Sequence, residues 1–341
     1  ELTMATYKGI KGVKVVTKTA DPTASEAVGT VWYNSTGDAL KYATQGGGVW
    51  ASGTNYPQTF QEFPGSAGTS TAALSWAGYQ QGGSYLNSSY EYDGTTWAAN
   101  VSMNRSPGAY TQGLGTQTAA LSGGYYRTSP AATLTDSEDY NGSAWTTTNP
   151  TINALGKRTG CGTVTAGLEA GGDDIGPAAP VATSESYDGT SWANVASLNT
   201  ARSMAATHNG VLTAAFTIGG ASPATNIYAN VEEYDGTSWT ETTDINTARK
   251  TLQGFGTTAL ALVFAGEPSP TVITAATESW NGTTWTEVAD LATARFSGGS
   301  TTGTTNTGGL CIGGSLGPPG SSNAVEEWAD PSYTIKTVTV S

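Results

Sequence analysis

Hydrophobic and polar positions form short runs along this chain and show no helical period. Apolar stretches such as 212–218 and 260–264 contain few polar breaks, which is typical of strands covered on both faces. Shorter alternating stretches end at Gly, Asn, Asp or Ser, which are turn formers. The composition agrees, because 45 Gly, 16 Tyr and 10 Trp suit turns and strands, whereas 12% charged residues are too few for long surface helices. We therefore expect an all-β protein.

One hairpin motif recurs at nearly constant spacing. A Tyr or Trp is followed by Asp-Gly or Asn-Gly and, three residues after the Gly, by a Trp. Asp-Gly and Asn-Gly favour the primed turns that join twisted antiparallel strands. The motif therefore predicts a β-hairpin in each unit, with the second aromatic residue packing the sheet. These tryptophans are Trp97, Trp145, Trp192, Trp239 and Trp285.

A pair of small residues precedes each hairpin and sets the number of repeats. The pairs are Ala77-Gly78, Gly123-Gly124, Gly171-Gly172, Gly219-Gly220, Ala265-Gly266 and Gly313-Gly314. An apolar strand stands before each pair, and a further strand is needed before that one. Four short strands in a unit of ~47 residues are typical of a propeller blade. The sequence thus predicts a β-propeller of six blades.

The order of markers within a unit resembles the kelch repeat. Arg202 is followed by Phe216–Gly220, then by Val231–Tyr234 and then by Trp239, and the same order recurs over residues 59–330. More narrowly, the start at Met4–Val13, the Ala, Thr and Gly-rich repeats and the ending 326–339 resemble kelch-like virion proteins of marine tailed phages. The resemblance implies a non-enzymatic fibre, appendage or decoration protein at the virion surface, outside the cell.

The two ends depart from the repeat. The stretches Val31–Gly37, Ala39–Tyr42 and Val49–Ala51 predict a three-stranded meander. We interpret residues 1–58 as an attachment domain that docks to other virion proteins, and residues 59–341 as the propeller. The alternative is a seventh blade completed by Tyr7–Val16. Ser332–Val340 is predicted to be a final outer strand of the last blade, which could also pair with another chain.

Charge excludes some partners. The net charge of −13 disfavours binding to nucleic acid or to anionic membranes. No apolar run approaches the ~20 residues of a membrane helix, and the start does not resemble a signal peptide.

Cys161 and Cys311 stand in different repeats, so we expect buried free thiols. We expect a homo-oligomer or many copies on a particle.

Enzyme interpretations fail on the residues available. A kelch-type galactose oxidase needs two copper-binding histidines, but the chain has only His208, which we place in an exposed turn. Two Cys and one His cannot form the usual zinc sites. The stretch Ser186–Trp192 is similar to a sialidase Asp-box but is one residue short. We predict no catalytic residues and no cofactor, and only a weak Ca²⁺ candidate at Asp173 and Asp174.

Arginine and glutamate recur in one register. A regular position argues for contacts between blades rather than for one active site. We predict a structural ring of Arg–Glu pairs on the face where the third strand of each blade begins, with Tyr90 replacing the acid in the first repeat. Its members are Arg105, Arg158, Arg202, Arg249, Arg295, Glu138, Glu185, Glu232, Glu278 and Glu326.

The segments that differ between repeats are the candidate recognition loops. They are residues 79–89, 125–136, 173–183, 221–230, 267–276 and 315–324. Variable loops on a constant scaffold commonly carry binding sites, and aromatic side chains can stack on a host-surface glycan or on a protein. The binding candidates are Tyr79, Tyr85, Tyr125, Tyr126, Arg127 and Tyr228. The alternatives to a virion protein are a secreted bacterial kelch-type lectin or adhesin and, more distantly, a glycan hydrolase.

Overall fold

The structure is a computed structural model of the 341-residue chain. It divides into two compact units, residues 49–329 and residues 1–48 with 330–341, and each is described by itself. The structure describes residues 15–22, 30–45, 47–59, 63–80, 84–104, 108–110, 113–128, 131–174, 179–206, 210–223, 225–303, 306–318, 320–329 and 333–338. The predicted turn at His208, the predicted strand Tyr7–Val16 except its last two residues, and Arg105 lie outside these residues.

Within the described part of the larger unit, the strands form six four-stranded antiparallel sheets. The first sheet has β5 (Gly65–Thr69), β6 (Ala72–Trp76), β9 (Ser89–Tyr92) and β10 (Trp97–Asn100). The second has β11 (Leu114–Thr116), β12 (Ala119–Ser122), β15 (Ser137–Tyr140) and β16 (Trp145–Thr148). The third has β17 (Thr159–Thr163), β18 (Ala166–Ala170), β19 (Ser184–Tyr187) and β20 (Trp192–Val195).

The remaining sheets continue the series. The fourth has β21 (Gly210–Val211), β22 (Ala214–Ile218), β23 (Val231–Tyr234) and β24 (Trp239–Thr242). The fifth has β25 (Gln253–Gly256), β26 (Ala261–Phe264), β27 (Thr277–Trp280) and β28 (Trp285–Val288). The sixth has β29 (Gly299–Ser300), β30 (Gly308–Gly317), β31 (Gly320–Ala329) and β4 (Val49–Ser52).

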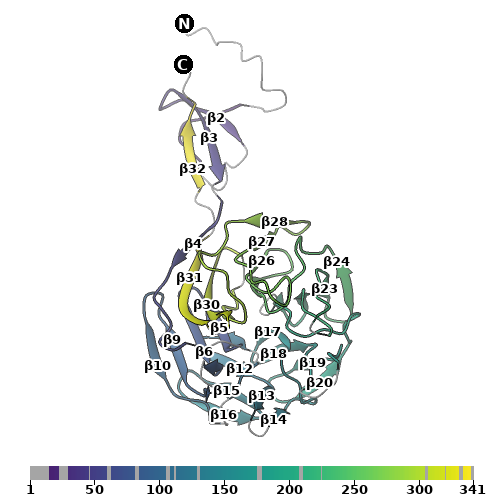
Figure 1. Cartoon of the computed structure of the whole chain (residues 1–341). Helices are drawn as coiled ribbons and strands as arrows, with labels where there is room; N and C mark the ends of the chain where they lie inside the picture. Colours follow the sequence, from purple (N-terminus) through teal and green to yellow (C-terminus); the bar gives the residue numbers. More distant parts are fainter. Residues whose placement is uncertain are drawn as a thin grey trace. The chain divides into compact units, whose positions relative to one another are not determined.

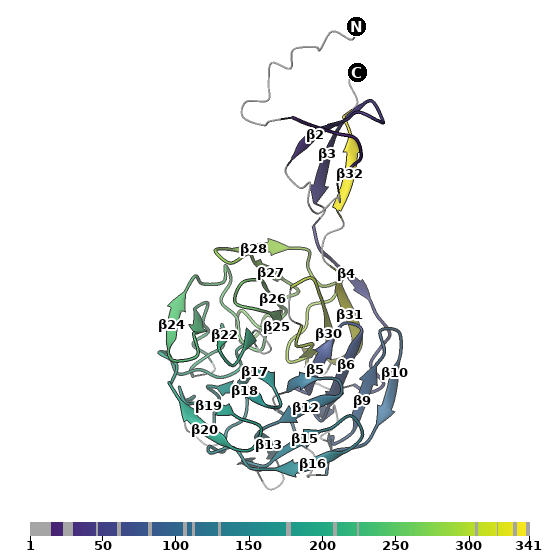
Figure 2. The same cartoon turned by 180° about the vertical axis from the view of Figure 1, so that it is seen from behind.

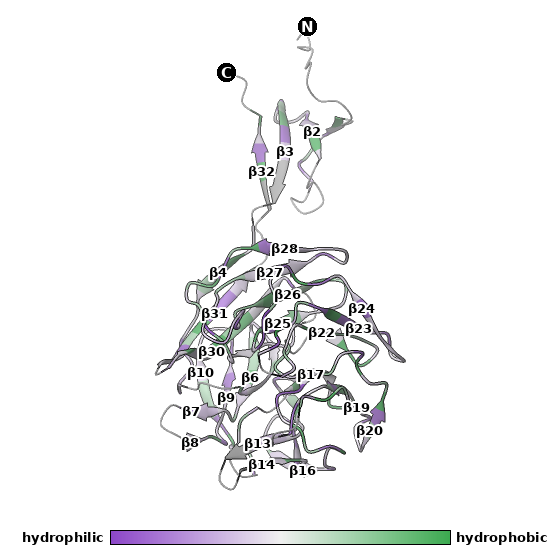
Figure 3. Cartoon of the chain, turned by 45° about the vertical axis from the view of Figure 1, so that its right-hand side comes forward, coloured by the Kyte–Doolittle hydropathy of each residue, from purple (hydrophilic) through white to green (hydrophobic). Residues whose placement is uncertain are grey.

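The six sheets stand around a common centre, with their first strands innermost (Figures 1 and 2). The first strands β5, β11, β17 and β21 pack on one another in turn, β25 packs on β29, and β29 packs on β5, so the last sheet meets the first. The second strands carry the apolar core: all four residues of β26 are buried, and Figure 3 shows the hydrophobic colouring along this strand. The predicted all-β propeller is confirmed.

The hairpin motif acts through its turn and its tryptophan. In the third sheet the Asp188 carboxylate accepts hydrogen bonds from the backbone N–H groups of Thr190 and Ser191, both at 2.8 Å. These bonds lower the pKa of Asp188, and the bond from Ser191 has the largest effect. The following tryptophan packs on the tyrosine before the turn, and in the fourth sheet the indole N–H of Trp239 donates to the carbonyl of Ala196 in the preceding sheet at 3.0 Å.

The sixth sheet is completed by a strand from the other end of the sequence. We predicted Val49–Ala51 as the third strand of an N-terminal meander, but β4 pairs with β31 as the outermost strand of this sheet. Trp50 packs on Trp328 at 5.4 Å and on Phe264 of the fifth sheet at 4.8 Å, and its indole N–H donates to the Thr277 hydroxyl. Trp50 stands 47 residues before Trp97, which is the position of an outer strand in the repeat. The predicted boundary at residue 58 is therefore too late.

The smaller unit has one four-stranded sheet of its own. Its strands are β1 (Val16–Lys18), β2 (Val31–Asn34), β3 (Ala39–Gln45) and β32 (Tyr333–Thr337). β1 is parallel to β2, and the other pairs are antiparallel. Asp21 accepts hydrogen bonds from Trp32, Asn34 and Lys41 beside this sheet. The prediction that Ser332–Val340 adds an outer strand to the last blade is wrong, since β32 pairs with β3.

Small residues line the centre of the ring. A cavity of about 160 Å³ lies where the first strands end, and Gly68, Gly115, Gly162 and Cys161 are among its lining residues. Thr302 spans part of this opening, because its hydroxyl lies 3.0 Å from the carbonyl oxygen of Gly68 and 2.9 Å from that of Gly115. Both cysteines are buried and unpaired, and burial raises the pKa of Cys161 to about 12. The thiols therefore stay protonated at neutral pH.

Buried arginines join consecutive sheets. Arg202 lies in the segment between the third and fourth sheets and is fully buried, as is Glu232. Its guanidinium pairs with Glu232 on β23 at 2.7 Å and donates to the carbonyls of Asn230 and Gly219. Its own carbonyl accepts a bond from Gly172 in the third sheet at 2.8 Å. One residue thus holds the third sheet through its backbone and the fourth through its side chain.

The same arrangement recurs at Arg249–Glu278 and Arg295–Glu326 and explains the glycine pairs, since Gly220 and Gly266 donate to the carbonyls of Arg249 and Arg295. The predicted common register does not extend to Arg158, because Arg158 follows residue 157 whereas Arg202 precedes the equivalent residue 204. Arg158 pairs instead with Glu169 and Glu185, both in the third sheet, and Glu138 accepts a bond from the backbone of Asn104. Gly171 has φ +64, and a Cβ there would lie 2.4 Å from the Arg202 carbonyl oxygen. The glycine is needed because the backbone carrying the arginine passes against it. In the first sheet Tyr90 packs on Tyr56 instead, with ring centroids 5.2 Å apart.

We predict that Arg202→Ala lowers the free energy of unfolding by about 3–5 kcal/mol, because Glu232 is then left buried without its ion pair. Urea unfolding of Arg202→Ala, Glu232→Ala and the double variant measures the coupling. The double variant is expected to lose much less than the sum of the two single losses. Strict additivity would contradict a coupled pair, and Thr240→Ala at an exposed position of β24 is the control.

We also predict that Trp50→Ala destabilises the larger unit by about 3 kcal/mol through lost packing at the sixth sheet. Thermal unfolding followed by circular dichroism measures the loss. Val49→Ala on the same strand is the matched control, because Val49 is 54% exposed and its removal should change stability by less than about 0.5 kcal/mol. Equal melting temperatures for Trp50→Ala and the parent would show that β4 does not contribute to closure of the ring.

Candidate functional site

Two short hairpins extend the loops between the second and third strands of the first two sheets. They are β7 (Tyr79–Gln80) with β8 (Ser84–Tyr85), and β13 (Tyr125–Thr128) with β14 (Ala131–Leu134). The segment after the first sheet pairs with the second hairpin, since Ala109 and Tyr126 exchange two backbone hydrogen bonds of 3.0 Å. These bonds hold loops of two neighbouring sheets in one place.

The paired loops bring four tyrosines together. Ring centroids lie 5.0 Å apart for Tyr79 and Tyr85, 6.4 Å for Tyr85 and Tyr126, and 5.8 Å for Tyr110 and Tyr126. All four side chains are partly exposed. We call these four residues the tyrosine cluster. Partly exposed phenol rings offer an apolar face and a polar edge to a ligand, at little conformational cost.

A lysine borders the tyrosine cluster. The Lys157 ammonium lies 5.0 Å from the centroid of the Tyr110 ring and 3.2 Å from a carboxylate oxygen of Asp173. Asp173 also accepts a bond from the Ser203 hydroxyl at 3.1 Å. The site therefore combines aromatic faces, phenol hydroxyls and one compensated ion pair.

Of the six binding candidates, three fall in the cluster, two do not, and the side chain of the sixth is not described. Tyr79, Tyr85 and Tyr126 lie together, whereas Tyr125 is only 1% exposed. The Tyr228 hydroxyl donates to the carbonyl of Ser222, and its ring lies 5.5 Å from the Arg202 guanidinium. Tyr228 therefore supports the loop of the fourth sheet. The Arg127 side chain lies outside the described residues.

Sequence reasoning missed Tyr110. Residues 110, 157 and 204 stand 47 positions apart and share a positive φ of 56–58°, so they occupy one position of the repeat. The residue type at this position differs between repeats, as it does in the loops, and that variation was the signal by which Tyr110 could have been found. Tyr110 adds an aromatic ring at the border of a recognition loop.

The surroundings of Asp173 and Asp174 do not favour metal binding. No group of three or more His, Cys, Asp or Glu side chains suited to a metal ion occurs among the described residues. Asp173 is paired with Lys157, whose charge opposes cation binding, and Asp174 accepts a bond from the Thr133 hydroxyl. Among the described residues, the predicted Ca²⁺ candidate therefore lacks a third His, Cys, Asp or Glu ligand. Nor does any helix within the described ranges reach the length and apolarity required to cross a membrane.

Comparison with known proteins supports the fold. No family model matches the chain, and no curated protein matches its sequence. Among solved structures, the one titled "Structure of YjhT" superposes with a TM-score of 0.65 at 14% sequence identity. The match covers 83% of this chain and 99% of that chain. At this identity the likeness concerns the fold alone.

Proposed function

We propose that this protein is a non-enzymatic adhesion protein of the kelch type, carried on the surface of a virion as a fibre, appendage or decoration protein. Its ligand in this proposal is a host-surface glycan. The observation that carries the proposal is the tyrosine cluster, in which three tyrosines of the variable loops stand in a row: the Tyr85 ring lies 5.0 Å from that of Tyr79 and 6.4 Å from that of Tyr126.

The chemistry of the site favours binding over bond cleavage. Its polar groups are phenol hydroxyls and the Lys157–Asp173 ion pair. Protonated phenols at neutral pH donate and accept hydrogen bonds but are weak acids and bases. Sugar rings present apolar C–H faces and hydroxyl edges, which match the faces and hydroxyls of tyrosine.

The smaller unit is the proposed attachment part. β2 and β3 come from residues 1–58, and β32 supplies a strand from the other chain end. Val15 and Val16 beside β2 are 44% and 45% exposed, and exposed strand residues of this kind favour pairing with another chain. The partners in this proposal are other virion proteins or further copies of this chain.

We predict that Tyr79→Ala combined with Tyr85→Ala reduces binding of the purified protein to host cells and to their immobilised surface glycans at least tenfold. Loss of two aromatic contacts at a binding centre is commonly worth about 1–3 kcal/mol. Surface plasmon resonance and a glycan array measure the change. Val272→Ala, in the loop of the fifth sheet, is the matched control because Val272 is 50% exposed.

The outcome also separates the alternatives. Undiminished binding by the double variant would contradict adhesion through the tyrosine cluster. Antibody labelling of intact virus particles tests the location, and protein found only in bacterial culture medium would favour a secreted lectin. Release of sugar from any arrayed glycan would contradict the non-enzymatic proposal.

A further inference from the structure

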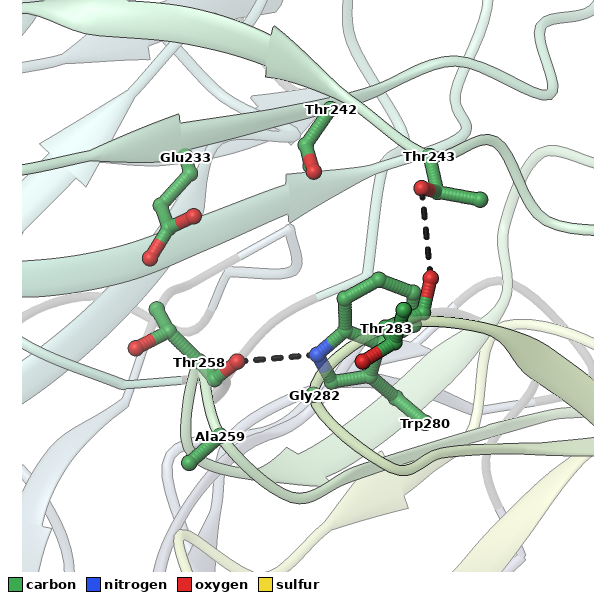
Figure 4. A pocket seen from close by; sticks show the side chains of 8 residues that line it. All are labelled: Glu233, Thr242, Thr243, Thr258, Ala259, Trp280, Gly282 and Thr283. Carbon is green, nitrogen blue, oxygen red and sulfur yellow. Dashed lines mark hydrogen bonds between the residues drawn. The ribbon is translucent and has the colours of Figure 1, made fainter.

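A pocket of about 440 Å³ opens between the fourth and fifth sheets (Figure 4). Its lining residues are Glu233, Thr242, Thr243, Thr258, Ala259, Trp280, Gly282 and Thr283. They come from β23, from β24 and its end, from the end of β27, and from the tight turns that join β25 to β26 and β27 to β28. In an antiparallel sheet these turns lie at the edge opposite the variable loops. The pocket is therefore separate from the tyrosine cluster of the first two sheets.

The repeat shows what the position of Glu233 binds elsewhere. At two other junctions a glutamate that precedes the aromatic residue of one sheet accepts a hydrogen bond from the phenol of the next sheet, whereas the shorter Asp139 leaves the Tyr187 hydroxyl to Thr148. The Tyr140 hydroxyl donates to Glu91 at 2.9 Å, and the Tyr92 hydroxyl donates to Glu327. In both places the carboxylate receives the hydroxyl of a six-membered ring.

Between the fourth and fifth sheets the acid is present but the phenol is not. Glu233 occupies the acid position, and residue 280 is tryptophan instead of tyrosine. An indole carries no hydroxyl, and its single N–H donor is used, since Trp280 donates to the carbonyl of Thr258 at 2.8 Å. The hydroxyl that the repeat supplies to this carboxylate is missing here.

The pocket lies where that hydroxyl would arrive. Glu233 is partly exposed and extends from β23 toward the turn that carries Thr258 (Figure 4). The hydroxyls of Thr242 and Thr258 line the same opening, and the Thr243 hydroxyl donates to the Thr283 carbonyl at 3.4 Å. A carboxylate accepts hydrogen bonds and the neighbouring threonine hydroxyls donate and accept them, so together they can bind several hydroxyls of one polyhydroxylated ring.

We propose that this pocket is a saccharide subsite in which Glu233 accepts hydrogen bonds from vicinal ring hydroxyls. Its volume falls within the range of small-molecule sites. The existence of the pocket is independent of the adhesion proposal, whereas the choice of a saccharide rests on that proposed function. The subsite gives the molecule a second contact with glycan, at the opposite edge of the ring from the tyrosine cluster.

Titration of the full chain with free monosaccharides tests this subsite. The probes are D-glucose, D-galactose, D-mannose and N-acetyl-D-glucosamine, followed by saturation-transfer NMR and by isothermal calorimetry. We expect millimolar binding of at least one sugar to the parent and at least a tenfold loss in Glu233→Gln. Glu287→Gln on β28 is the matched control, because it removes the same charge from an exposed position of the fifth sheet.

A second variant separates binding from folding. Trp280→Tyr restores the residue found at this position in the first four sheets, so its phenol is expected to bond Glu233 as Tyr140 bonds Glu91. This variant should melt like the parent and still lose sugar binding at least tenfold. A Trp280→Tyr or Glu233→Gln protein that binds sugar like the parent would overturn the subsite.

Two further results would also overturn the saccharide subsite. The first is that the parent protein binds none of the four sugars. The second is that the pocket binds a cation such as tetramethylammonium, attracted by the Glu233 carboxylate, but no neutral sugar. Neither result bears on the tyrosine cluster, whose test is adhesion to host glycans by the Tyr79 and Tyr85 variants. Conversely, a parent that fails to adhere but binds a monosaccharide through Glu233 would contradict the adhesion proposal and leave the subsite standing.

Discussion

The larger unit depends on a guanidinium buried between consecutive sheets. A fully buried arginine costs several kcal/mol unless its charge is paired and its donors have acceptors. Arg202 meets this demand with one carboxylate and two backbone carbonyls of the fourth sheet. Burial by itself lowers the pKa of Arg202, and the Glu232 carboxylate counteracts that effect. Because these partners belong to one sheet and the backbone of Arg202 bonds another, neither sheet can shift without breaking the set.

This constraint makes the repeat rigid and leaves variation to its margins. The glycine pair is fixed by close approach of the arginine backbone, the acid by the guanidinium, and the Asp-Gly turn by its own hydrogen bonds. The loops after the second strand of each sheet and the aromatic residue before each hairpin turn are not fixed by these contacts. Variation in the loops allows the tyrosine cluster, and the tryptophan in place of tyrosine at residue 280 leaves the pocket beside Glu233.

The sequence predicted what local chemistry determines. Turn residues and aromatic pairs are visible because each recurs at one interval, as do Arg202, Arg249 and Arg295 with their glutamates, and these were enough to predict the propeller. Strand pairing across the sequence was not visible. Val49–Ser52 and Tyr333–Thr337 have the pattern of strands in whichever sheet they join, so β4 and β32 were assigned to each other's units. Tyr110 was missed because it lies in the segment that joins the first two sheets, far in sequence from the predicted loops, and Trp280 because tryptophan and tyrosine both satisfy the packing pattern of the hairpin.

Closure of the ring by β4 couples the two units through the chain itself. Val49 pairs with Ala329 in the sixth sheet, and Gln45 pairs with Tyr333 in the small sheet. Only residues 46–48 and 330–332 separate these two pairs. Each sheet thus joins strands from the two ends of the sequence, and loop-closure entropy makes such long-range pairing the most costly step in forming either sheet. The seam of the ring therefore depends on a pairing that no local motif of the repeat encodes.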